Sequence, residues 1–118
     1  TCSVYADIFC LREILGNLID NAIKYSKDEV EIILSCEEVA GSTLIKVRDN
    51  GIGIPLKEQW KIFNKFERLS ANNRKSGISG FGLGLSYVLQ VMKAHDGMVS
   101  VESVEGSYSE FTMRFPLN

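Results

Sequence analysis

The order of apolar and polar positions predicts a helix and then a hairpin in the first half of the chain. Apolar side chains recur at helical spacing between residues 7 and 27 and form one broad face: Leu11, Ile14, Leu15, Leu18, Ile19 and Ala22. Asp7 is the predicted N-cap of this helix. Residues 30–39 and 44–47 are strand-like runs on either side of the turn Ala40-Gly41-Ser42, so they predict a hairpin.

The second half of the chain has a similar pattern. Residues 56–69 predict a short helix or two, and a longer helical pattern over residues 85–95 ends at Asp96-Gly97. Residues 98–104 and 108–115 then predict a second hairpin. Helices that alternate with hairpins favour the α/β (α+β) class, as a two-layer α/β sandwich with a mixed, mostly antiparallel sheet.

Length and charge narrow the function classes. The 118 residues suffice for one compact domain, and the abrupt start at Thr1 suggests a fragment of a longer chain. A net charge of −2 argues against broad nucleic-acid or membrane-surface binding, because both use basic patches. No apolar run reaches the length of a membrane span. An anionic ligand would therefore need positive potential that is supplied locally.

Cysteine and histidine usage argues against metal and disulfide chemistry. Cys2, Cys10 and Cys36 are odd in number and lack Cys-x-x-Cys spacing, so we expect inert thiols in a reducing compartment. The single histidine, His95, excludes a histidine-rich metal site.

One face of the first predicted helix carries a cluster of polar side chains: Glu13, Asn17, Asp20, Asn21 and Lys24. A solvated surface is the ordinary interpretation of such a face. Asparagine, however, is a weaker helix former than Glu, Lys or Gln, so two of them four residues apart need another reason. Their carboxamide oxygens are suited to a hard cation such as Mg²⁺, which keeps waters and shares ligands with phosphates.

Two glycine-rich segments are the other candidates for chemistry. In residues 49–55 an Asp stands beside alternate glycines. The Asp can accept a hydrogen bond from an exocyclic amine, and the glycines leave room for a flat base. The alternative interpretation of this segment is a plain surface turn. In residues 80–85 a Gly-x-Gly-x-Gly turn opens a helix, whose free N–H groups suit phosphates. The second segment fits neither the P-loop nor the dinucleotide-binding pattern.

Together these segments resemble the catalytic domain of sensor histidine kinases, in the GHKL nucleotide-binding superfamily. Residues 12–26 match its N box, residues 49–54 its G1 box, residues 61–68 its F box and residues 80–85 its G2 box. The resemblance covers most of the chain and implies the Bergerat fold, a single ATP-binding domain over residues 1–118, and ATP with Mg²⁺ as cofactors.

The resemblance also implies roles for matching residues. Asn21 is similar to the Mg²⁺ ligand, with Asn17 on metal or phosphate, and Lys24 is similar to a phosphate contact; these three are the expected catalytic residues. Tyr25 resembles the aromatic residue against base or sugar, and Asp49 the adenine reader. The remaining expected ATP contacts are Gly51, Gly53 and Ile54 in the G1 box, Gly80, Gly82, Leu83, Gly84 and Leu85 in the G2 box, and the cations Arg68, Arg74 and Lys75 in or near the lid, residues 70–79.

By the same resemblance, the γ-phosphate would pass to a histidine in a separate dimerisation and phosphotransfer domain of the parent chain, and then to a response regulator. A cytoplasmic location is implied, without nucleic acid or direct membrane contact, in a parent anchored in the inner membrane. His95 matches a structural turn, not the phosphoacceptor. A GHKL-type ATPase, an anti-sigma-type serine kinase and a nucleotide-sensing module without catalysis are the alternatives. Asn17 stands where the ATPases have a Glu that activates water, which favours phosphotransfer.

Overall fold

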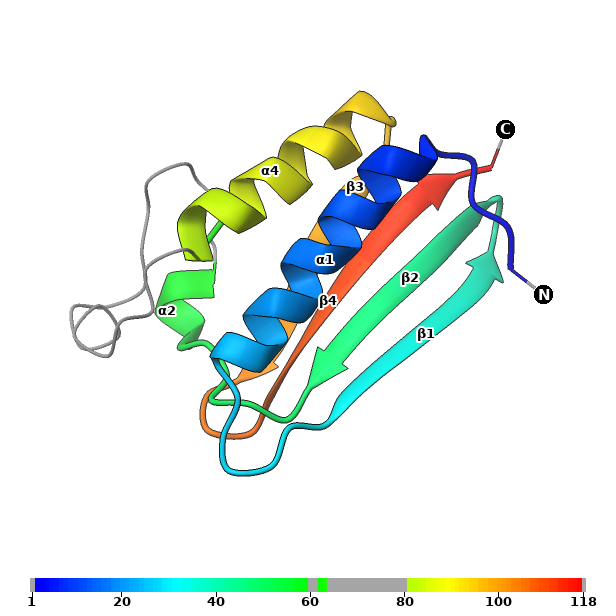
Figure 1. The fold of residues 1–118 in the computed structure, drawn as a ribbon. Helices are drawn as coiled ribbons and strands as arrows, with labels where there is room; N and C mark the ends of the chain where they lie inside the picture. The colour runs from blue at the N-terminus through cyan, green and yellow to red at the C-terminus, as the bar shows by residue number, and fades with distance from the viewer. Residues whose placement is uncertain (1, 60–61, 64–80, 118) are drawn as a thin grey trace.

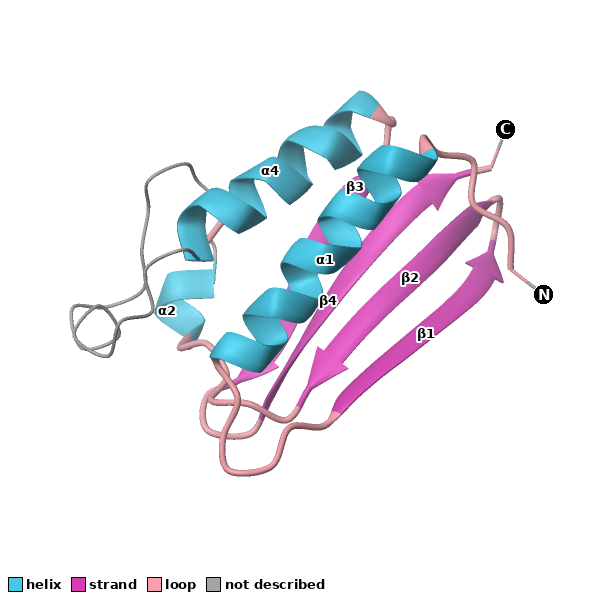
Figure 2. Ribbon diagram, viewed as in Figure 1, coloured by secondary structure: helices cyan, strands magenta, loops and turns pink. Residues whose placement is uncertain are grey.

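The computed structural model describes residues 2–59, 62–63 and 81–117 of the chain. Its elements are α1 (Ile8–Lys24), β1 (Ile32–Val39), β2 (Ser42–Asp49), α2 (Leu56–Gln59), α4 (Phe81–Ala94), β3 (Met98–Val104) and β4 (Tyr108–Pro116). The strands form one sheet in the order β1-β2-β4-β3, and every described pair is antiparallel. Helices α1 and α4 cover one face of this sheet (Figure 1, Figure 2), which confirms the predicted α/β sandwich.

Helix α1 begins where the sequence predicts and ends earlier. The Asp7 carboxylate accepts a hydrogen bond from the Cys10 N–H at 3.0 Å, which confirms the predicted N-cap. The helix ends at Lys24, before the predicted boundary at residue 27. Tyr25 is the C-cap, and its N–H still donates to the Asn21 carbonyl at 3.0 Å. The Ser26 hydroxyl donates to the Ile23 carbonyl at 2.8 Å, so it competes with a further helical turn.

The first hairpin differs from its prediction at both strands: β1 begins at Ile32, later than the predicted residue 30, and β2 is longer than its apolar run. Val39 pairs with Ser42 across a two-residue turn, in which Ala40 has φ 49° and Gly41 φ 81°. Two positive φ values give the turn a twist that matches the strands on either side. Because β2 extends beyond residues 44–47 at both ends, Asp49 becomes the last residue of the strand.

The core lies between the sheet and the two long helices. Alternate residues of β4 point into it, as the period of two requires, and they meet buried side chains of both helices and of β2: Phe111, Met113 and Phe115 from β4, Ile14 and Leu18 from α1, Leu85, Val88 and Met92 from α4, and Val47 from β2. Each such side chain contributes about 1.5–3 kcal/mol by leaving water. The sheet and helices are thereby held as one body.

Helix α4 begins at Phe81, four residues before the predicted start, so the Gly-rich segment belongs to its first turns. At its other end Asp96 takes φ 59°, and the Gly97 N–H donates to the Met92 carbonyl at 2.8 Å. This is a Schellman cap, and it confirms the predicted helix end. A Cβ at Gly97 would lie 2.2 Å from the Arg114 carbonyl oxygen. No described helix is both long and apolar enough to cross a membrane.

Candidate functional site

The polar face of α1 has two buried or half-buried residues, and its other residues are exposed. Asn21 is only 6% exposed, and its Nδ2 has no hydrogen-bond partner among the described residues. Asn17 is half-buried, and its Nδ2 donates to the Gly84 carbonyl of α4 at 3.4 Å. Glu13, Asp20 and Lys24 are exposed. The solvated-face interpretation is therefore wrong for the two asparagines, because Asn17 contacts the start of α4 and Asn21 is enclosed with residues of β2, β4 and the segment after β2.

Asp49 ends β2 with a buried carboxylate. The residue is 7% exposed, and its Oδ1 accepts a hydrogen bond from the Gly51 N–H at 2.8 Å. Burial raises the pKa of Asp49 above its ordinary value, against the Gly51 hydrogen bond and the positive charge of Arg48. A carboxylate that is held out of water at a strand end is a strong acceptor for a ligand donor.

The glycines of the segment after β2 are required by contacts within the protein. A Cβ at Gly51 would lie 2.4 Å from the Tyr25 carbonyl oxygen. Gly53 has φ 72°, and a Cβ there would lie 2.2 Å from the Val104 carbonyl oxygen. These glycines let the segment pack between the end of α1 and the turn that joins β3 to β4. They make room for protein backbone, whereas the sequence suggested room for a base.

Tyr25 joins the end of α1 to that segment. Its side chain is 6% exposed, and its carbonyl accepts from the Ile52 N–H at 3.0 Å. Lys24, the residue before it, is exposed in the last turn of α1. The structure therefore places the predicted aromatic contact beside Asp49 and leaves the predicted phosphate contact in solvent.

Polar residues of the second hairpin support the site, and the sequence analysis missed them. Ser109 is 5% exposed and pairs with Asp49 in the sheet register. The Ser103 hydroxyl accepts from the Ile54 N–H at 2.8 Å, donates to the Tyr108 carbonyl at 2.7 Å and lies 2.9 Å from the Ser109 hydroxyl. The available signal was the period of β4, because Ser109 is a polar residue on a face that is otherwise Phe, Met and Phe.

A small pocket lies among these residues. It has about 10 Å³ of space open to the centre of a water molecule. Residues of α1, β2, β4 and the segment after β2 line it: Asn21, Tyr25, Asp49, Gly53, Ile54, Ser109 and Phe111. That volume suits about one water molecule and is far too small for a purine ring.

The start of α4 contacts α1 through its backbone, because the Gly84 carbonyl accepts from Asn17. The residues Gly82, Leu83 and Gly84 lie in the first turn of α4, where N–H groups have no partner within the helix. Leu85 is fully buried in the core, so it contributes packing. The phosphate contacts of this segment stay a prediction. Gly80, Arg68, Arg74, Lys75 and the predicted lid lie outside the described residues.

Part of the predicted F box is described. Ile62 is 3% exposed, and the Phe63 ring meets the Phe111 ring edge-on with centroids 6.1 Å apart. Phe63 is therefore a packing residue. Trp60 and Phe66 lie outside the described residues.

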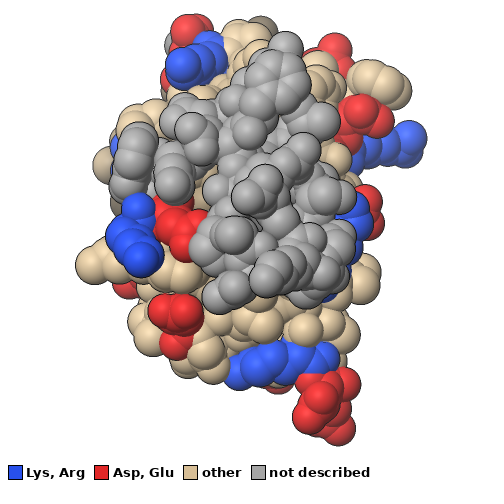
Figure 3. Space-filling model, turned by 90° about the vertical axis from the view of Figure 1, so that its left-hand side faces the viewer, with Lys and Arg blue, Asp and Glu red and all other residues tan. Residues whose placement is uncertain are grey.

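The side chains that could bind a metal ion at this site are carboxamides. Within the described residues no group of three or more His, Cys, Asp or Glu side chains could hold an ion. Asn21 has a buried unpartnered amide, and a half turn of that carboxamide would present its oxygen in the same place. Carboxamide oxygens fit Mg²⁺ that shares its other positions with phosphates and water. On the face drawn in Figure 3, the described Lys and Arg side chains are interspersed with Asp and Glu side chains.

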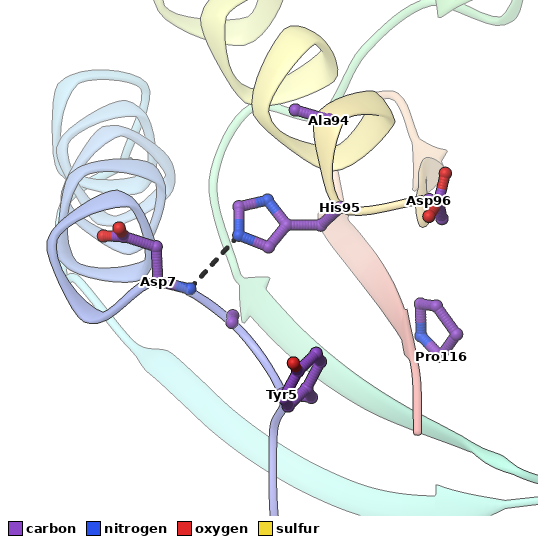
Figure 4. Close-up of a pocket in the computed structure, with 7 residues that line it drawn as sticks. Tyr5, Asp7, Ala94, His95, Asp96 and Pro116 are labelled. Atoms are coloured by element: carbon purple, nitrogen blue, oxygen red, sulfur yellow. Dashed lines mark hydrogen bonds between the residues drawn. The ribbon is translucent and has the colours of Figure 1, made fainter. Parts of the chain in front are cut away.

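A second cavity, of about 670 Å³, lies at the opposite end of the helices, between the start of α1 and the end of α4. There His95 Nε2 accepts from the Asp7 N–H at 3.2 Å, while Nδ1 lies 2.8 Å from the Val91 carbonyl and must donate to it. The Asp7 and Asp96 carboxylates point away from the ring (Figure 4). His95 joins the N-terminal segment to α4, in line with its predicted structural role.

The fold and the buried Asn–Asp site define a nucleotide-binding domain. The family model described as "Histidine kinase-, DNA gyrase B-, and HSP90-like ATPase" matches residues 6–118, and the chain belongs to this family.

Similar proteins are sensor kinases. The sensor protein RprX of Bacteroides fragilis is 35% identical over 116 residues, which are 97% of this chain and 22% of RprX. The adaptive-response sensory kinase SasA of Crocosphaera subtropica is 40% identical over 115 residues, which are 97% of this chain and 29% of SasA. Full-length ShkA in complex with AMPPNP superposes with a TM-score of 0.83 at 28% identity, over 98% of this chain and 23% of ShkA. The chain thus spans less than a third of these proteins.

Proposed function

We propose that this domain binds Mg-ATP and donates the γ-phosphate to a histidine of a separate phosphoacceptor domain in two-component signalling. The parent chain would supply that domain, and a response regulator would receive the phosphoryl group. The observation that carries the proposal is the buried, unpartnered carboxamide of Asn21 beside the buried carboxylate of Asp49. The likeness to RprX and SasA supports it.

At the base end, Asp49 would accept a hydrogen bond from the 6-amino group of adenine. Because the pocket at Asp49 and Ser109 has room for about one water, the base would lie across its mouth with a water beneath it. Guanine offers a carbonyl oxygen where adenine offers the amine, and that oxygen would face the carboxylate. Adenine selectivity follows from this single contact.

At the phosphate end, Asn21 with Asn17 would hold Mg²⁺, whose charge offsets that of the phosphates. The exposed ammonium of Lys24 and the free N–H groups at the start of α4 would share the remaining charge. Asn17 would exchange its 3.4 Å hydrogen bond to Gly84 for this contact. Phosphoryl transfer needs mainly positioning and charge neutralisation, and these groups supply both.

The residue at position 17 favours transfer over hydrolysis. A carboxamide cannot take a proton from water, so Asn17 cannot serve as a general base. Glu13, one turn earlier, is exposed and reaches none of the pocket residues in the described contacts. We therefore expect the isolated domain to bind ATP and turn it over slowly or not at all.

Calorimetric titration with ATP, with and without Mg²⁺, tests the binding step. Asn21→Ala should weaken Mg-dependent binding roughly tenfold or more, in line with a lost ligand contact of about 1.5–3 kcal/mol. Asp20→Ala, at an exposed neighbouring position, is the matched control and should leave binding unchanged. Equal binding by wild type and Asn21→Ala would remove Asn21 from the site.

The transfer step needs an acceptor. ATP labelled at the γ-phosphate would be mixed with this domain and a purified phosphoacceptor domain from a sensor kinase. Acid-labile, base-stable label on that acceptor is the expected result, because phosphohistidine has this stability. Steady hydrolysis that survives Asn17→Ala and is lost in Glu13→Gln would instead identify an ATPase.

A further inference from the structure

The segment that precedes α1 lies against the uncovered margin of the sheet (Figure 1). The Ser3 N–H donates to the Glu38 carboxylate at 2.9 Å, and the Thr43 hydroxyl donates to the Ser3 carbonyl. Glu38 and Thr43 face each other in the β1–β2 register. Ser3 is therefore fixed over the turn end of this hairpin by contacts to both of its strands.

This position brings two cysteines together. Cys36 lies two residues before Glu38 in β1, so the alternation of a strand turns both side chains to the same face. Cys2 adjoins Ser3, so the contacts of Ser3 place Cys2 over the face of the hairpin that carries Cys36, and Cys2 contributes to the raised pKa of Cys36. All three cysteines of the chain are free thiols, and Cys36 is exposed while Cys2 is half-buried. Small reagents in solution can therefore reach the pair.

We propose that Cys2 and Cys36 are a redox-responsive dithiol that closes to a disulfide and fastens the N-terminal segment to β1. The co-reactant is a low-molecular-weight disulfide. The Cys2 thiolate attacks one of its sulfurs and releases the first small thiol, which leaves a mixed disulfide on Cys2. Cys36 loses its proton, attacks the Cys2 sulfur and expels the second small thiol. Two protein thiols and one small disulfide thus become one protein disulfide and two small thiols.

The environment of Cys36 sets the order of these steps. Desolvation of the thiol, followed by its hydrogen bond with Cys2, raises the pKa of Cys36 to about 11. The thiolate is the nucleophile in exchange, so Cys36 is a slow first attacker at neutral pH. Once Cys2 carries the mixed disulfide, proximity compensates for the small thiolate fraction of Cys36. The closing step should accelerate roughly tenfold for each pH unit until the pH approaches the pKa of Cys36.

The consequence is a change in how firmly the N-terminal segment is held. In the reduced state the contacts of Ser3 and the hydrogen bond between Asp7 and His95 anchor it to the domain. A disulfide between Cys2 and Cys36 would close a long covalent loop that contains α1 and the start of β1. Disulfides in a reducing compartment are usually transient and respond to oxidative load, so the dithiol would be the resting state.

The test uses the whole chain in glutathione buffers of increasing oxidised fraction, followed by acid quenching, alkylation of free thiols and peptide mapping by mass spectrometry. We expect a Cys2–Cys36 linked peptide in monomeric protein from the wild type and from Cys10→Ser. We expect Cys2→Ser and Cys36→Ser to yield glutathione mixed disulfides and no linked peptide. The oxidised wild type should melt roughly 5–15 °C higher than the reduced protein, because a loop of this length restricts the unfolded chain.

Two results would overturn the proposal. One is that Cys2 and Cys36 acquire glutathione without forming the linked peptide at any buffer ratio. The other is that the disulfide forms only between two copies of the chain. The reaction would then depend on the exposure of Cys36 to other molecules and not on its proximity to Cys2. The Cys10→Ser comparison separates both results from a general oxidation of the protein.

Discussion

Replacing Asp49 by Asn should stabilise the free domain and weaken its binding of ATP. The carboxylate is 7% exposed, and burial raises its pKa, so the ionised form is less favourable in the folded protein than in the unfolded chain. Asn has nearly the same shape, and its carbonyl oxygen can still accept the Gly51 N–H, which lies 2.8 Å from Asp49 Oδ1. The substitution therefore removes the buried charge and keeps the hydrogen bond.

The two effects have opposite signs and similar sizes. Removing a buried charge that its neighbours only partly compensate yields on the order of 0.5–2 kcal/mol of stability. A hydrogen bond from the 6-amino group of adenine to a charged acceptor is worth about 1.5–3 kcal/mol, so ATP affinity should fall roughly 10- to 150-fold. With the Asn carbonyl kept on the Gly51 N–H, the Asn amide nitrogen takes the place of the second carboxylate oxygen and can donate to the carbonyl of guanine, so the preference for ATP over GTP should shrink.

The pH dependence separates this explanation from a packing effect. Because the folded-state pKa of Asp49 is raised above 3.8, the stability that its neutral form provides is fully present below that pH. It is lost as the pH rises through the folded-state pKa. The advantage of Asp49→Asn over the wild type should therefore be small near pH 4 and grow toward neutral pH.

Thermal unfolding of the wild type and of Asp49→Asn between pH 4 and neutral pH measures the difference in stability. Calorimetry with ATP and with GTP measures the binding. Asp20→Asn, at an exposed position, changes the net charge by the same amount and should show neither effect. An advantage that is the same at every pH would refute the role of the buried charge. A less stable Asp49→Asn at neutral pH would mean that the ionised carboxylate is stabilised by its surroundings.

Other substitutions test the packing that supports the site. Gly53→Ala should cost roughly 2–4 kcal/mol in chemical denaturation, because the new Cβ would lie 2.2 Å from the Val104 carbonyl at φ 72°. Gly16→Ala has nothing within 4 Å of its new Cβ and lies inside α1, so it should stabilise by about 0.5–1 kcal/mol; a loss would contradict the helical assignment. Ser103→Ala removes the acceptor of the Ile54 N–H, so it should cost about 1–3 kcal/mol of stability and weaken ATP binding. An unchanged Kd for ATP would show that the Ser103 hydrogen bonds do not support the site.

Local patterns predicted most of the fold. The periodicity of residues 7–27 and the two hairpin signals specify elements whose evidence lies within a few neighbouring residues. Boundaries were less accurate where backbone contacts decide them, as at the end of α1, where the Ser26 hydroxyl takes the Ile23 carbonyl. Helix α4 starts before Gly82 because the helix continues through glycines that local propensity disfavours.

The parts of the site that the sequence did not reveal depend on distant contacts. Asn21 is buried with residues of β2, β4 and the segment after β2, and the pattern within α1 does not predict those neighbours. Ser109 reaches Asp49 through a register between strands that lie far apart in the chain. The contact between Cys2 and Cys36 likewise needs the N-terminal segment to cross the sheet margin, so a count of cysteines alone suggested three inert thiols.

The two ends of the site differ in how rigidly they are held. The segment after β2 is tied by backbone hydrogen bonds from Ile52 to Tyr25 and from Gly106 to Ile52, and the Ser103 hydroxyl holds Ile54. The base end is therefore pre-organised, and little ordering opposes the binding of adenine. At the other end, the Asn17 side chain of α1 donates to the Gly84 carbonyl at the start of α4 at 3.4 Å, at the weak limit of hydrogen bonding. Because this contact is easily given up, the phosphate end can rearrange around its ligand while the base end stays fixed.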